Sequence, residues 1–468
     1  MKRLASDNML HRLALAEIIS LIRSKSISAL ELVNAHLDRI ERRNPHLNAF
    51  TMVLADQARE SARRADQGLP VGPLHGIPVT VKDSFDIAGL PTRLGSFFAP
   101  ETPADQDAAV VSRLRRAGAI ILGKTNTPEF LGSYETDNFI TGRTNNPWDL
   151  DRTPGGSSGG EAAAIAGRCS PGGVGSDGGG SIRVPAHFCG IAGLKPTPGR
   201  ISIIGHRPSE GVRGIAAVGP MARSVADLRI LFEALAGYDD RDALSAPIPV
   251  RPPVLDDLRI GVMEQFGDIP VQASIRKAVQ GAAVALRGLG FTVDEFRAEG
   301  IERAPNLWGL FFSELPARAN KERIAGREAE AHWTYTENLD RALDRPPVSG
   351  WQVVESMAAR DAMRRRLVEQ MRRFPVLLMP VSSIVAFPHR ERRFQTDTKP
   401  VGLFQAMMPS TTFNVLGLPA LTVPFALTDE GLPVGVQLVA RPWEEELLLE
   451  LGVLLEAARG PLPEPPED

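Results

Sequence analysis

The chain has 468 residues, of which 43% are hydrophobic and 23% charged, a balance typical of an ordinary globular protein with one large core or two smaller ones. A formal charge of −3 gives no reason to expect nucleic acid or an anionic membrane as a partner, so we expect a small-molecule ligand. The two cysteines, Cys169 and Cys189, are too few for a disulfide framework or a tetrahedral zinc site, and they favour a reducing, cytoplasmic location.

The first 66 residues are predicted to be helical. Polar or charged residues interrupt residues 1–26 every few positions, so this stretch predicts neither a signal peptide nor a membrane anchor. Residues 26–50 and 56–67 show helical periodicity with charges on the outer face. An amphipathic helix near the N-terminus is indicated by apolar residues at helical spacing, namely Leu13, Ile18, Ile19 and Ile22.

From residue 67 onward, β-branched runs alternate with helical patterns. Val79–Val81 is predicted to be a buried strand that ends at Lys82. A helix over 108–118 leads into a strand over 119–126, and a strand–helix–strand unit spans 258–296. This alternation predicts an α/β fold, with a mixed β-sheet core covered by helices on both faces.

The C-terminal part begins with a stretch, 301–405, in which aromatic residues are scattered among charged helices. We interpret its basic helix, 357–374, as a solvated face rather than an anion-binding surface. Strands over 419–425 and 434–440 predict a hairpin, and a covering helix follows over 444–458.

No internal repeat or long linker divides the chain, so we expect one large domain over 1–462. Its expected parts are a helical segment (1–66), a core (67–240), a variable, substrate-shaping region (241–415), and a C-terminal hairpin and helix (416–462). Residues 463–468 are expected to form a disordered tail.

Residues 153–190 contain glycine and serine far more densely than the rest of the chain. A phosphate-binding loop is disfavoured, because the required lysine and the G-x-G-x-x-G spacing are missing. A nucleophile elbow would fit G-x-S-x-G with Ser157 or Ser158 at its centre, but an elbow needs a preceding strand and 144–154 is rich in turn residues. A Ser-His-Asp enzyme also needs a histidine, and no recognisable signature surrounds His187, His206, His332 or His389.

Three consecutive glycines, Gly178, Gly179 and Gly180, directly precede Ser181. Glycines let the backbone bend so that several N–H groups converge beside the hydroxyl, which is what an oxyanion hole requires. We therefore expect the glycines to supply an oxyanion hole and Ser181 the nucleophile. The alternative is a tight turn between strand and helix, for which one or two glycines normally suffice.

A serine nucleophile needs a base, and a lysine can serve where burial keeps it neutral. Lys82 fits because it ends an apolar strand. Lys124 is the rival candidate, but glycine precedes it and turn residues follow it.

Four segments, in this order, resemble the amidase signature family: GIPVTVKD (76–83), GGSSGGEAAA (155–164), GSDGGGSIRVPAHFCGIAGLKPTPGR (175–200) and GLPVGVQLVA (431–440). The resemblance implies a Ser-cisSer-Lys triad that hydrolyses or transfers the acyl group of amides. Ser181 matches the nucleophile, Ser157 the cis-serine relay and Lys82 the base. No metal or organic cofactor is implied.

The resemblance also implies roles for the residues around the triad. Glu161, which opens the helix after the two serines, needs no catalytic role because a carboxylate suits a helix N-terminus. Residues that match positions bracing the triad are Ser158, Asp177 and Arg183. Residues that match the lining of the acyl pocket are Leu131, Gly132 and Ser133. Residues 301–415 are expected to shape the rest of the pocket. Four of them would suit an aryl or alkyl acyl group, although several of the four are expected to belong to the core instead: Phe404, Met407, Met408 and Phe413.

The expected function is hydrolysis of a small-molecule amide; esters present a better leaving group to the same nucleophile. An alternative within the family is the A subunit of a glutamyl-tRNA amidotransferase, which passes ammonia from glutamine to a charged tRNA. That subunit typically carries a GRVSR block, whereas residues 199–203 read GRISI, which favours a stand-alone amidase. A catalytically silent binding protein on the same fold is a third alternative, and the intact triad argues against it. A homodimer is the default expectation for the assembly.

Overall fold

An eleven-stranded mixed β-sheet forms the centre of the computed structural model, which describes residues 7–208 and 214–467. The strand order is β1-β3-β2-β4-β6-β5-β12-β13-β9-β7-β8. The strands are β1 (Phe50–Val53), β2 (Pro78–Lys82), β3 (Ile120–Thr125), β4 (Gly172–Asp177), β5 (Ala192–Lys195), β6 (Ala217–Ala222), β7 (Arg259–Val262), β8 (Thr292–Glu295), β9 (Val376–Pro380), β12 (Ala420–Leu427) and β13 (Pro433–Ala440). A separate two-stranded sheet pairs β10 (Arg393–Phe394) with β11 (Val401–Gly402).

The direction of three neighbouring strands determines where the functional loops begin. β2 runs parallel to both β3 and β4, whereas β4 runs antiparallel to β6. Parallel neighbours end at the same edge of a sheet. Lys82 at the end of β2 and Asp177 at the end of β4 therefore lie at one edge, from which the glycine loop continues to α6.

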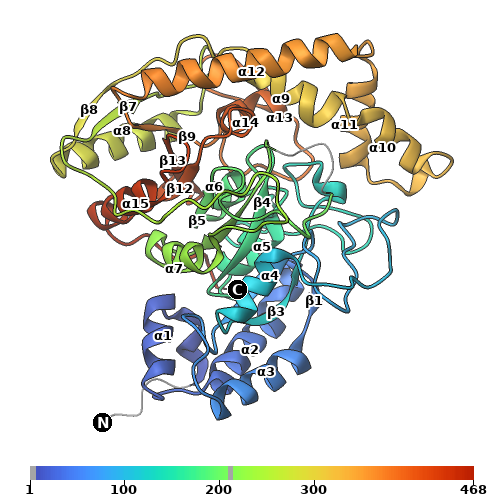
Figure 1. Ribbon diagram of the computed structural model, residues 1–468, viewed down its shortest axis with the longest axis vertical. Helices are drawn as coiled ribbons and strands as arrows, with labels where there is room; N and C mark the ends of the chain where they lie inside the picture. Colours follow the sequence, from blue (N-terminus) through green and yellow to red (C-terminus); the bar gives the residue numbers. More distant parts are fainter. Residues whose placement is uncertain (1–6, 209–213, 468) are drawn as a thin grey trace.

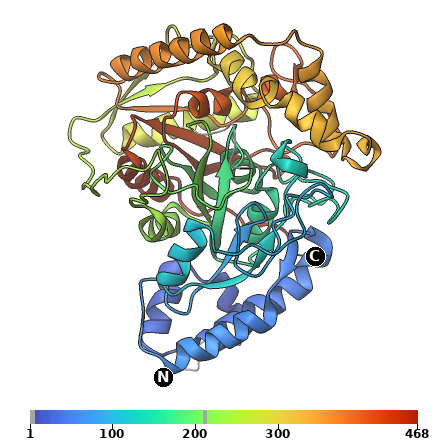
Figure 2. The same ribbon diagram turned by 45° about the vertical axis from the view of Figure 1, so that its right-hand side comes forward.

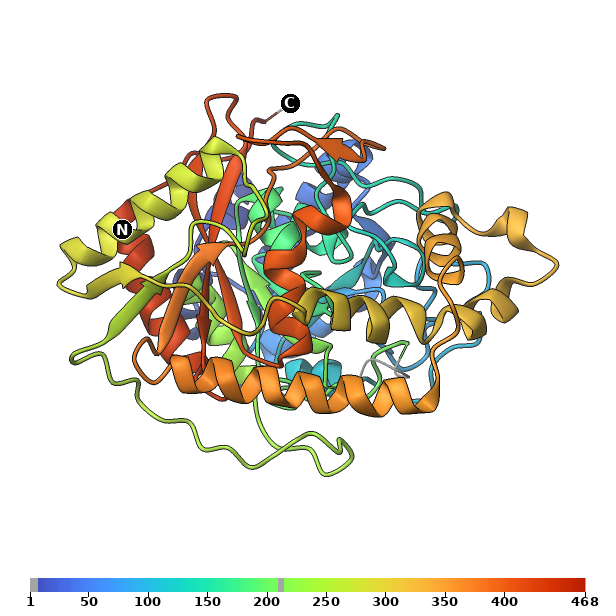
Figure 3. The same cartoon turned by 90° about the horizontal axis from the view of Figure 1, so that it is seen from above.

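Helices cover both faces of the sheet (Figures 1 and 3), which confirms the predicted fold class. On one face α7, α8 and α15 pack together, and on the other α5 and α6 do. The helices are α1 (Leu15–Arg23), α2 (Ala29–Leu47), α3 (Ala55–Gln67), α4 (Ala109–Arg116), α5 (Gly159–Ala166), α6 (Arg183–Cys189), α7 (Val225–Leu235), α8 (Ala273–Gly288), α9 (Ala304–Gly309), α10 (Ala317–Ile324), α11 (Trp333–Leu343), α12 (Gly350–Gln370), α13 (Leu403–Ala406), α14 (Met408–Val415) and α15 (Glu445–Arg459).

The predicted elements agree with the structure over most of the chain. The strand that delivers Lys82 is β2, and the C-terminal hairpin is β12 and β13, with α15 after it. Five strands of the large sheet were not expected: β5, β6, β9, the glycine-rich β4, and β1, which pairs with β3 where the helical pattern was extended to residue 50. In the parts of the chain that the structure describes, every helix is too short or too polar to span a bilayer.

The N-terminal helices lie at the end of the molecule opposite α12 (Figures 1 and 2). The tail that follows α15 packs there too, which corrects the expectation of disorder for residues 463–467; Asp468 lies outside the described residues. Glu464 forms ion pairs with Arg12, at 3.2 Å, and with Arg168. The tail carboxylates thus pair with arginines from the N-terminal part and from the loop between α5 and β4.

Short helices between residues 304 and 343 project over the sheet edge where β2 and β4 end. They run from α9 through a π-helical turn, Leu310–Glu314, to α10 and α11. π-Helical turns are rare and occur frequently at functional sites. This segment supplies much of the cavity wall described below.

Candidate active site

Lys82 and Ser157 are in direct contact. Lys82 Nζ donates hydrogen bonds to Ser157 Oγ at 2.7 Å and to Ser176 Oγ at 3.0 Å, and both Lys82 and Ser157 are buried. The Gly156–Ser157 peptide bond is cis. Burial lowers the pKa of Lys82 to about 7, because an apolar environment disfavours the ammonium form. A large fraction of Lys82 is therefore neutral near pH 7 and able to accept a proton.

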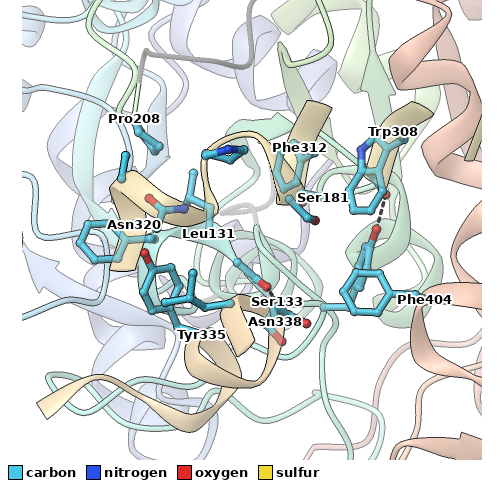
Figure 4. Close-up of a pocket in the computed structure, with 18 of the residues that line it drawn as sticks. Leu131, Ser133, Ser181, Pro208, Trp308, Phe312, Asn320, Tyr335, Asn338 and Phe404 are labelled. Atoms are coloured by element: carbon cyan, nitrogen blue, oxygen red, sulfur yellow. Dashed lines mark hydrogen bonds between the residues drawn. The ribbon is translucent and has the colours of Figure 1, made fainter. Parts of the chain in front are cut away.

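Ser181 lies at the end of the glycine loop, where it borders a cavity (Figure 4). Its carbonyl accepts a hydrogen bond from the Ser158 N–H at 3.1 Å, and Ser158 Oγ donates to the Ser176 carbonyl at 3.2 Å. Among the described residues, Ser157 Oγ and Ser181 Oγ form no hydrogen bond with each other. Catalytic hydrogen bonds of this kind often tighten only when substrate is bound.

Steric contacts explain why three glycines precede Ser181. A Cβ atom on Gly178 would lie 2.5 Å from the Phe312 ring, and one on Gly179 would lie 2.6 Å from the Trp308 ring. Gly180 has a φ of +113°, which L side chains rarely adopt. The loop thus needs glycine because aromatic rings pack directly on its backbone.

The expected set of oxyanion donors needs one correction. The Gly180 N–H donates to Asp177 Oδ1 at 2.7 Å, so it is already engaged. Within the described parts of the chain, the N–H groups of Gly178, Gly179 and Ser181 have no acceptor. Gly179 and Ser181 also line the cavity.

Asp177 and Arg183 brace this loop from behind. Arg183 Nε donates to Asp177 Oδ2 at 2.9 Å and Nη2 to Oδ1 at 3.0 Å. Arg183 Nη1 also donates to the Ser410 carbonyl and to Gln437 Oε1, and Asn414 Nδ2 donates to Asp177 Oδ1. Burial by itself raises the pKa of Asp177, but the Arg183 charge and these hydrogen bonds hold it well below its usual range. Asp177 is therefore ionised and fixes the start of the loop.

Lys124, the rival base, is engaged away from the two serines. Its Nζ lies 2.7 Å from Asp83 Oδ1 and donates to the Pro91 carbonyl at 2.9 Å. Lys124 is held by these partners and not by Ser157 or Ser181, so the geometry favours Lys82 as the base.

Glu161 is fully buried beneath the triad. Its carboxylate accepts hydrogen bonds from the Thr80 and Thr125 hydroxyls, the second at 2.7 Å. Burial raises the pKa of Glu161 to about 7, despite these hydrogen bonds and the nearby charge of Lys82. Full burial and two hydroxyl hydrogen bonds are more than a carboxylate needs in order to complement a helix N-terminus.

The cavity beside Ser181 has a volume of about 240 Å³. Leu131, Gly132 and Ser133, which the resemblance matches to the acyl pocket, line this cavity. Among the lining residues that the structure describes, none carries a carboxylate, and Arg323 carries the charge. The rest of the wall comes mainly from the segment after residue 300, namely Trp308, Phe312, Ser313, Pro316, Ala319, Asn320, Arg323, Tyr335, Asn338, Leu339 and Phe404.

The four apolar residues expected near the pocket have different positions. Phe404 lines the cavity. Met407 and Phe413 are fully buried in the core, and Met408 borders a second, separate hollow.

Several residues of the site escaped the motif comparison. Ser176 lies within the matched segment, but its contact with Lys82 follows only from the pairing of β2 with β4. Tyr134, Trp308 and Asn414 come from segments distant in sequence, and no local pattern marks them. No group of three or more His, Cys, Asp or Glu side chains in the described ranges is arranged to hold a metal ion.

Comparisons with known proteins agree with this geometry. Residues 31–449 match the model of the Amidase family. The chain is 37% identical to the A subunit of the glutamyl-tRNA(Gln) amidotransferase from Anaeromyxobacter sp. (strain K), over 97% of this chain and 98% of the relative. It is 35% identical to the indoleacetamide hydrolase of Bradyrhizobium diazoefficiens, over 94% and 85%.

Among solved structures, 6-aminohexanoate cyclic dimer hydrolase in complex with substrate superposes with a TM-score of 0.85 at 32% identity, over 96% of this chain and 97% of that chain. Further amidotransferase A subunits are 32% to 36% identical to the chain, so the relatives give this alternative more weight than the GRISI departure suggested. The protein is therefore an enzyme of the amidase family, the amidase signature enzymes that its sequence resembles.

Proposed function

We propose that the protein hydrolyses the C–N bond of a small-molecule amide with an apolar acyl group, through an acyl-enzyme on Ser181. The observation that carries this proposal is the buried 2.7 Å contact between Lys82 Nζ and Ser157 Oγ. A lysine whose pKa burial lowers to about 7 can act as a base, and Ser157 is the group beside it that can relay a proton.

Acylation would begin with two proton transfers. Neutral Lys82 takes the Ser157 hydroxyl proton, and Ser157 takes that of Ser181, whose oxygen attacks the amide carbonyl carbon. The negative charge that develops on the carbonyl oxygen is stabilised by the free N–H groups of the glycine loop. When the C–N bond breaks, the proton returns through Ser157 to the leaving nitrogen.

Deacylation would follow the same path with water. The relay removes a proton from a water molecule that attacks the acyl carbon, and the proton returns to Ser181 as the carboxylic acid leaves. The atoms balance: one amide and one water give one acid and one amine. Every proton is carried by side chains of this protein, and the proposal invokes no metal or organic cofactor.

The cavity supports an apolar acyl group. Aromatic rings form much of its wall, and mostly apolar pockets with few polar groups are typical of small-molecule sites. Much of this wall comes from the region between residues 241 and 415, which supports its proposed role in shaping the substrate site. We also propose a cytoplasmic location, since Cys169 and Cys189 are both free and buried, and a homodimer as the default assembly.

A second candidate function is that of the A subunit of a glutamyl-tRNA amidotransferase. The observation in its favour is the 37% identity to one of these proteins over almost the full length of both chains. Glutamine, however, carries an α-ammonium group, and the described cavity wall offers no carboxylate to pair with it. We therefore place this function second on the geometry, although the sequence relatives favour it.

Labelling with a fluorophosphonate serine probe, followed by peptide mass spectrometry, tests the nucleophile. We expect an adduct on Ser181 that is absent from Ser181→Ala and forms much more slowly on Lys82→Ala. An adduct on Ser157 or Ser158 would contradict the assigned roles.

A panel of primary amides, run with the protein alone, separates the two functions. We expect hydrolysis of aryl or alkyl carboxamides in preference to glutamine. Hydrolysis of glutamine that appears only when partner subunits are added would support the amidotransferase function instead.

A further inference from the structure

Side chains from outside the nucleophile loop hold three consecutive carbonyl groups of its backbone. Asn414 Nδ2 donates to the Asp177 carbonyl at 2.9 Å, Trp308 Nε1 to the Gly178 carbonyl at 2.7 Å, and the Tyr134 hydroxyl to the Gly179 carbonyl at 2.7 Å. Each of these donors belongs to a different part of the chain.

A trans peptide is planar, and its C=O and N–H groups point in opposite directions. A hydrogen bond to one carbonyl therefore also determines where the next residue's N–H points. By this geometry Trp308 orients the N–H of Gly179, and Tyr134 orients the N–H of Gly180.

The N–H groups of Gly179 and Gly180 differ in their hydrogen bonding. That of Gly180 donates to Asp177 Oδ1, so the peptide between Gly179 and Gly180 is held at both of its ends. That of Gly179 has no acceptor within the described residues, and Gly179 lines the cavity beside Ser181. Of these two peptides, the one that Trp308 holds offers a free donor to the cavity.

We propose that Trp308 is a positioning residue for the reaction: its indole N–H aims the Gly179 N–H at the developing oxyanion. The inference rests on the proposed function, since it assumes attack by Ser181. Trp308 is well placed for this because its ring is itself fixed. It is almost fully buried and stacks on Phe312, with ring centroids 4.9 Å apart and an interplanar angle of 16°.

The same ring forms part of the cavity wall, so Trp308 contacts both the acyl pocket and the backbone of the oxyanion site. A substrate that packs against the indole would press it onto the glycine loop. One side chain thus serves both acyl-group recognition and transition-state stabilisation. A purely structural tryptophan would not connect these two roles.

The test compares Trp308→Phe with the wild-type enzyme by the kinetics of fluorophosphonate labelling, which needs no known substrate. In this reaction the Ser181 oxygen forms a bond to phosphorus, fluoride leaves, and the phosphoryl oxygen occupies the oxyanion site. Phenylalanine keeps an apolar wall but lacks the N–H. We expect the maximal labelling rate constant to fall by about tenfold to hundredfold, since loss of one oxyanion donor costs about 10² to 10³ in rate and here the donor remains but is misdirected.

The concentration of probe that gives half-maximal labelling should change less than the rate constant does, because phenylalanine keeps an aromatic ring at this position of the wall. Leu339→Ala is the matched control: it alters the same cavity at an aliphatic residue that neither stacks on Trp308 nor donates a hydrogen bond to the loop, and it should shift that concentration more than the rate constant. An unchanged labelling rate constant in Trp308→Phe would overturn the inference.

A third protein keeps the inference testable if Trp308→Phe fails to fold. Replacing Trp308 by 3-benzothienylalanine substitutes sulfur for the N–H in a ring of nearly the same shape, and the same fall in rate constant is expected. A normal rate constant in this protein would show that the indole acts by shape alone and would overturn the inference. Failure of the wild-type enzyme to label at Ser181 would contradict the proposed function, and the inference would fall with it.

Discussion

Arg183 and Asp177 form an ion pair in which both side chains are completely shielded from solvent. The guanidinium Nε lies 2.9 Å from Asp177 Oδ2, and the same carboxylate accepts the Gly180 N–H through Oδ1. The pair thereby joins the end of β4 to the start of α6 and determines the path of the glycine loop between them.

Removal of the arginine should destabilise the protein strongly. Breaking a buried ion pair from one side leaves an uncompensated charge, which costs about 3–5 kcal/mol, so we expect Arg183→Ala to lower the free energy of unfolding in urea by that amount. Arg372, in an exposed pair with Glu369, is the control; Arg372→Ala should cost less than about 1 kcal/mol. Equal losses in the two variants would contradict the role of Arg183.

The contribution of this pair should also depend on pH. Arg183 holds the pKa of Asp177 below its unfolded value of about 3.9, so the stabilisation is fully present above that value and is lost as the pH falls through the folded pKa. The difference in unfolding free energy between wild type and Arg183→Ala should therefore shrink in strong acid. Urea denaturation at a series of pH values measures it.

The activity of the wild-type enzyme should rise with pH through about 7. Lys82 must be neutral to accept the Ser157 proton, and burial lowers its pKa to about 7. We expect log(kcat/KM) to increase with a slope near one below that pH and to level off above it. Residual activity of Lys82→Ala should lack this inflection; an unchanged profile in the variant would exclude Lys82 as the titrating base.

Glu161 should affect the pH at which this inflection occurs. In its ionised form its negative charge favours the ammonium form of Lys82, so replacing it by a neutral residue removes one of the influences that raise the pKa of Lys82. We expect Glu161→Gln, which retains polar atoms for Thr80 and Thr125, to move the acidic limb of the rate profile to lower pH. A shift to higher pH would mean that Glu161 acts on the reaction by another route.

Gly179 should not tolerate a methyl group. A Cβ at this position would lie 2.6 Å from Trp308 Cζ2, so either the indole or the loop must move. We expect Gly179→Ala to lower kcat by about a hundredfold, the value of one displaced oxyanion donor. Gly288→Ala is the control, because a Cβ there would meet nothing within 4 Å; full activity in both variants would contradict the close packing.

Phe404→Ala should change substrate preference rather than chemistry. The ring lines the cavity and donates no hydrogen bond to the loop, so its removal enlarges the pocket. Differences in apolar fit are worth about 1–3 kcal/mol, and we expect kcat/KM to shift by about tenfold or more towards amides with bulkier acyl groups. Competition assays between a small and a large amide measure the shift, and a proportional loss on both would argue against Phe404 as a wall residue.

The sequence predicted those features that depend on local pattern. A short β-branched run identified β2 and its terminal lysine, and three glycines before Ser181 indicated a loop with unusual backbone requirements. The glycine-rich strand β4 was missed because its residues have low strand propensity and form a strand only when paired between β2 and β6.

Contacts between distant segments could not be predicted in the same way. Nothing in the sequence around Tyr134, Trp308 or Asn414 indicates that all three would donate to neighbouring carbonyl groups. The engagement of the Gly180 N–H likewise depends on the side-chain rotamer of Asp177. Such details require the packed structure, because each is decided by three-dimensional neighbours and not by spacing along the chain.

The position of Trp308 has a consequence for how new specificities could arise on this scaffold. Enlarging the pocket at this residue would disturb the catalytic backbone at the same time, so a gain in substrate range there would come with slower turnover. Phe404 lies in the same wall and donates no hydrogen bond to the loop, although its ring contacts those of Trp308 and Tyr134. Natural drift and laboratory evolution should therefore accumulate changes at Phe404 first, while the indole is retained until a second mutation supplies another donor to Gly178.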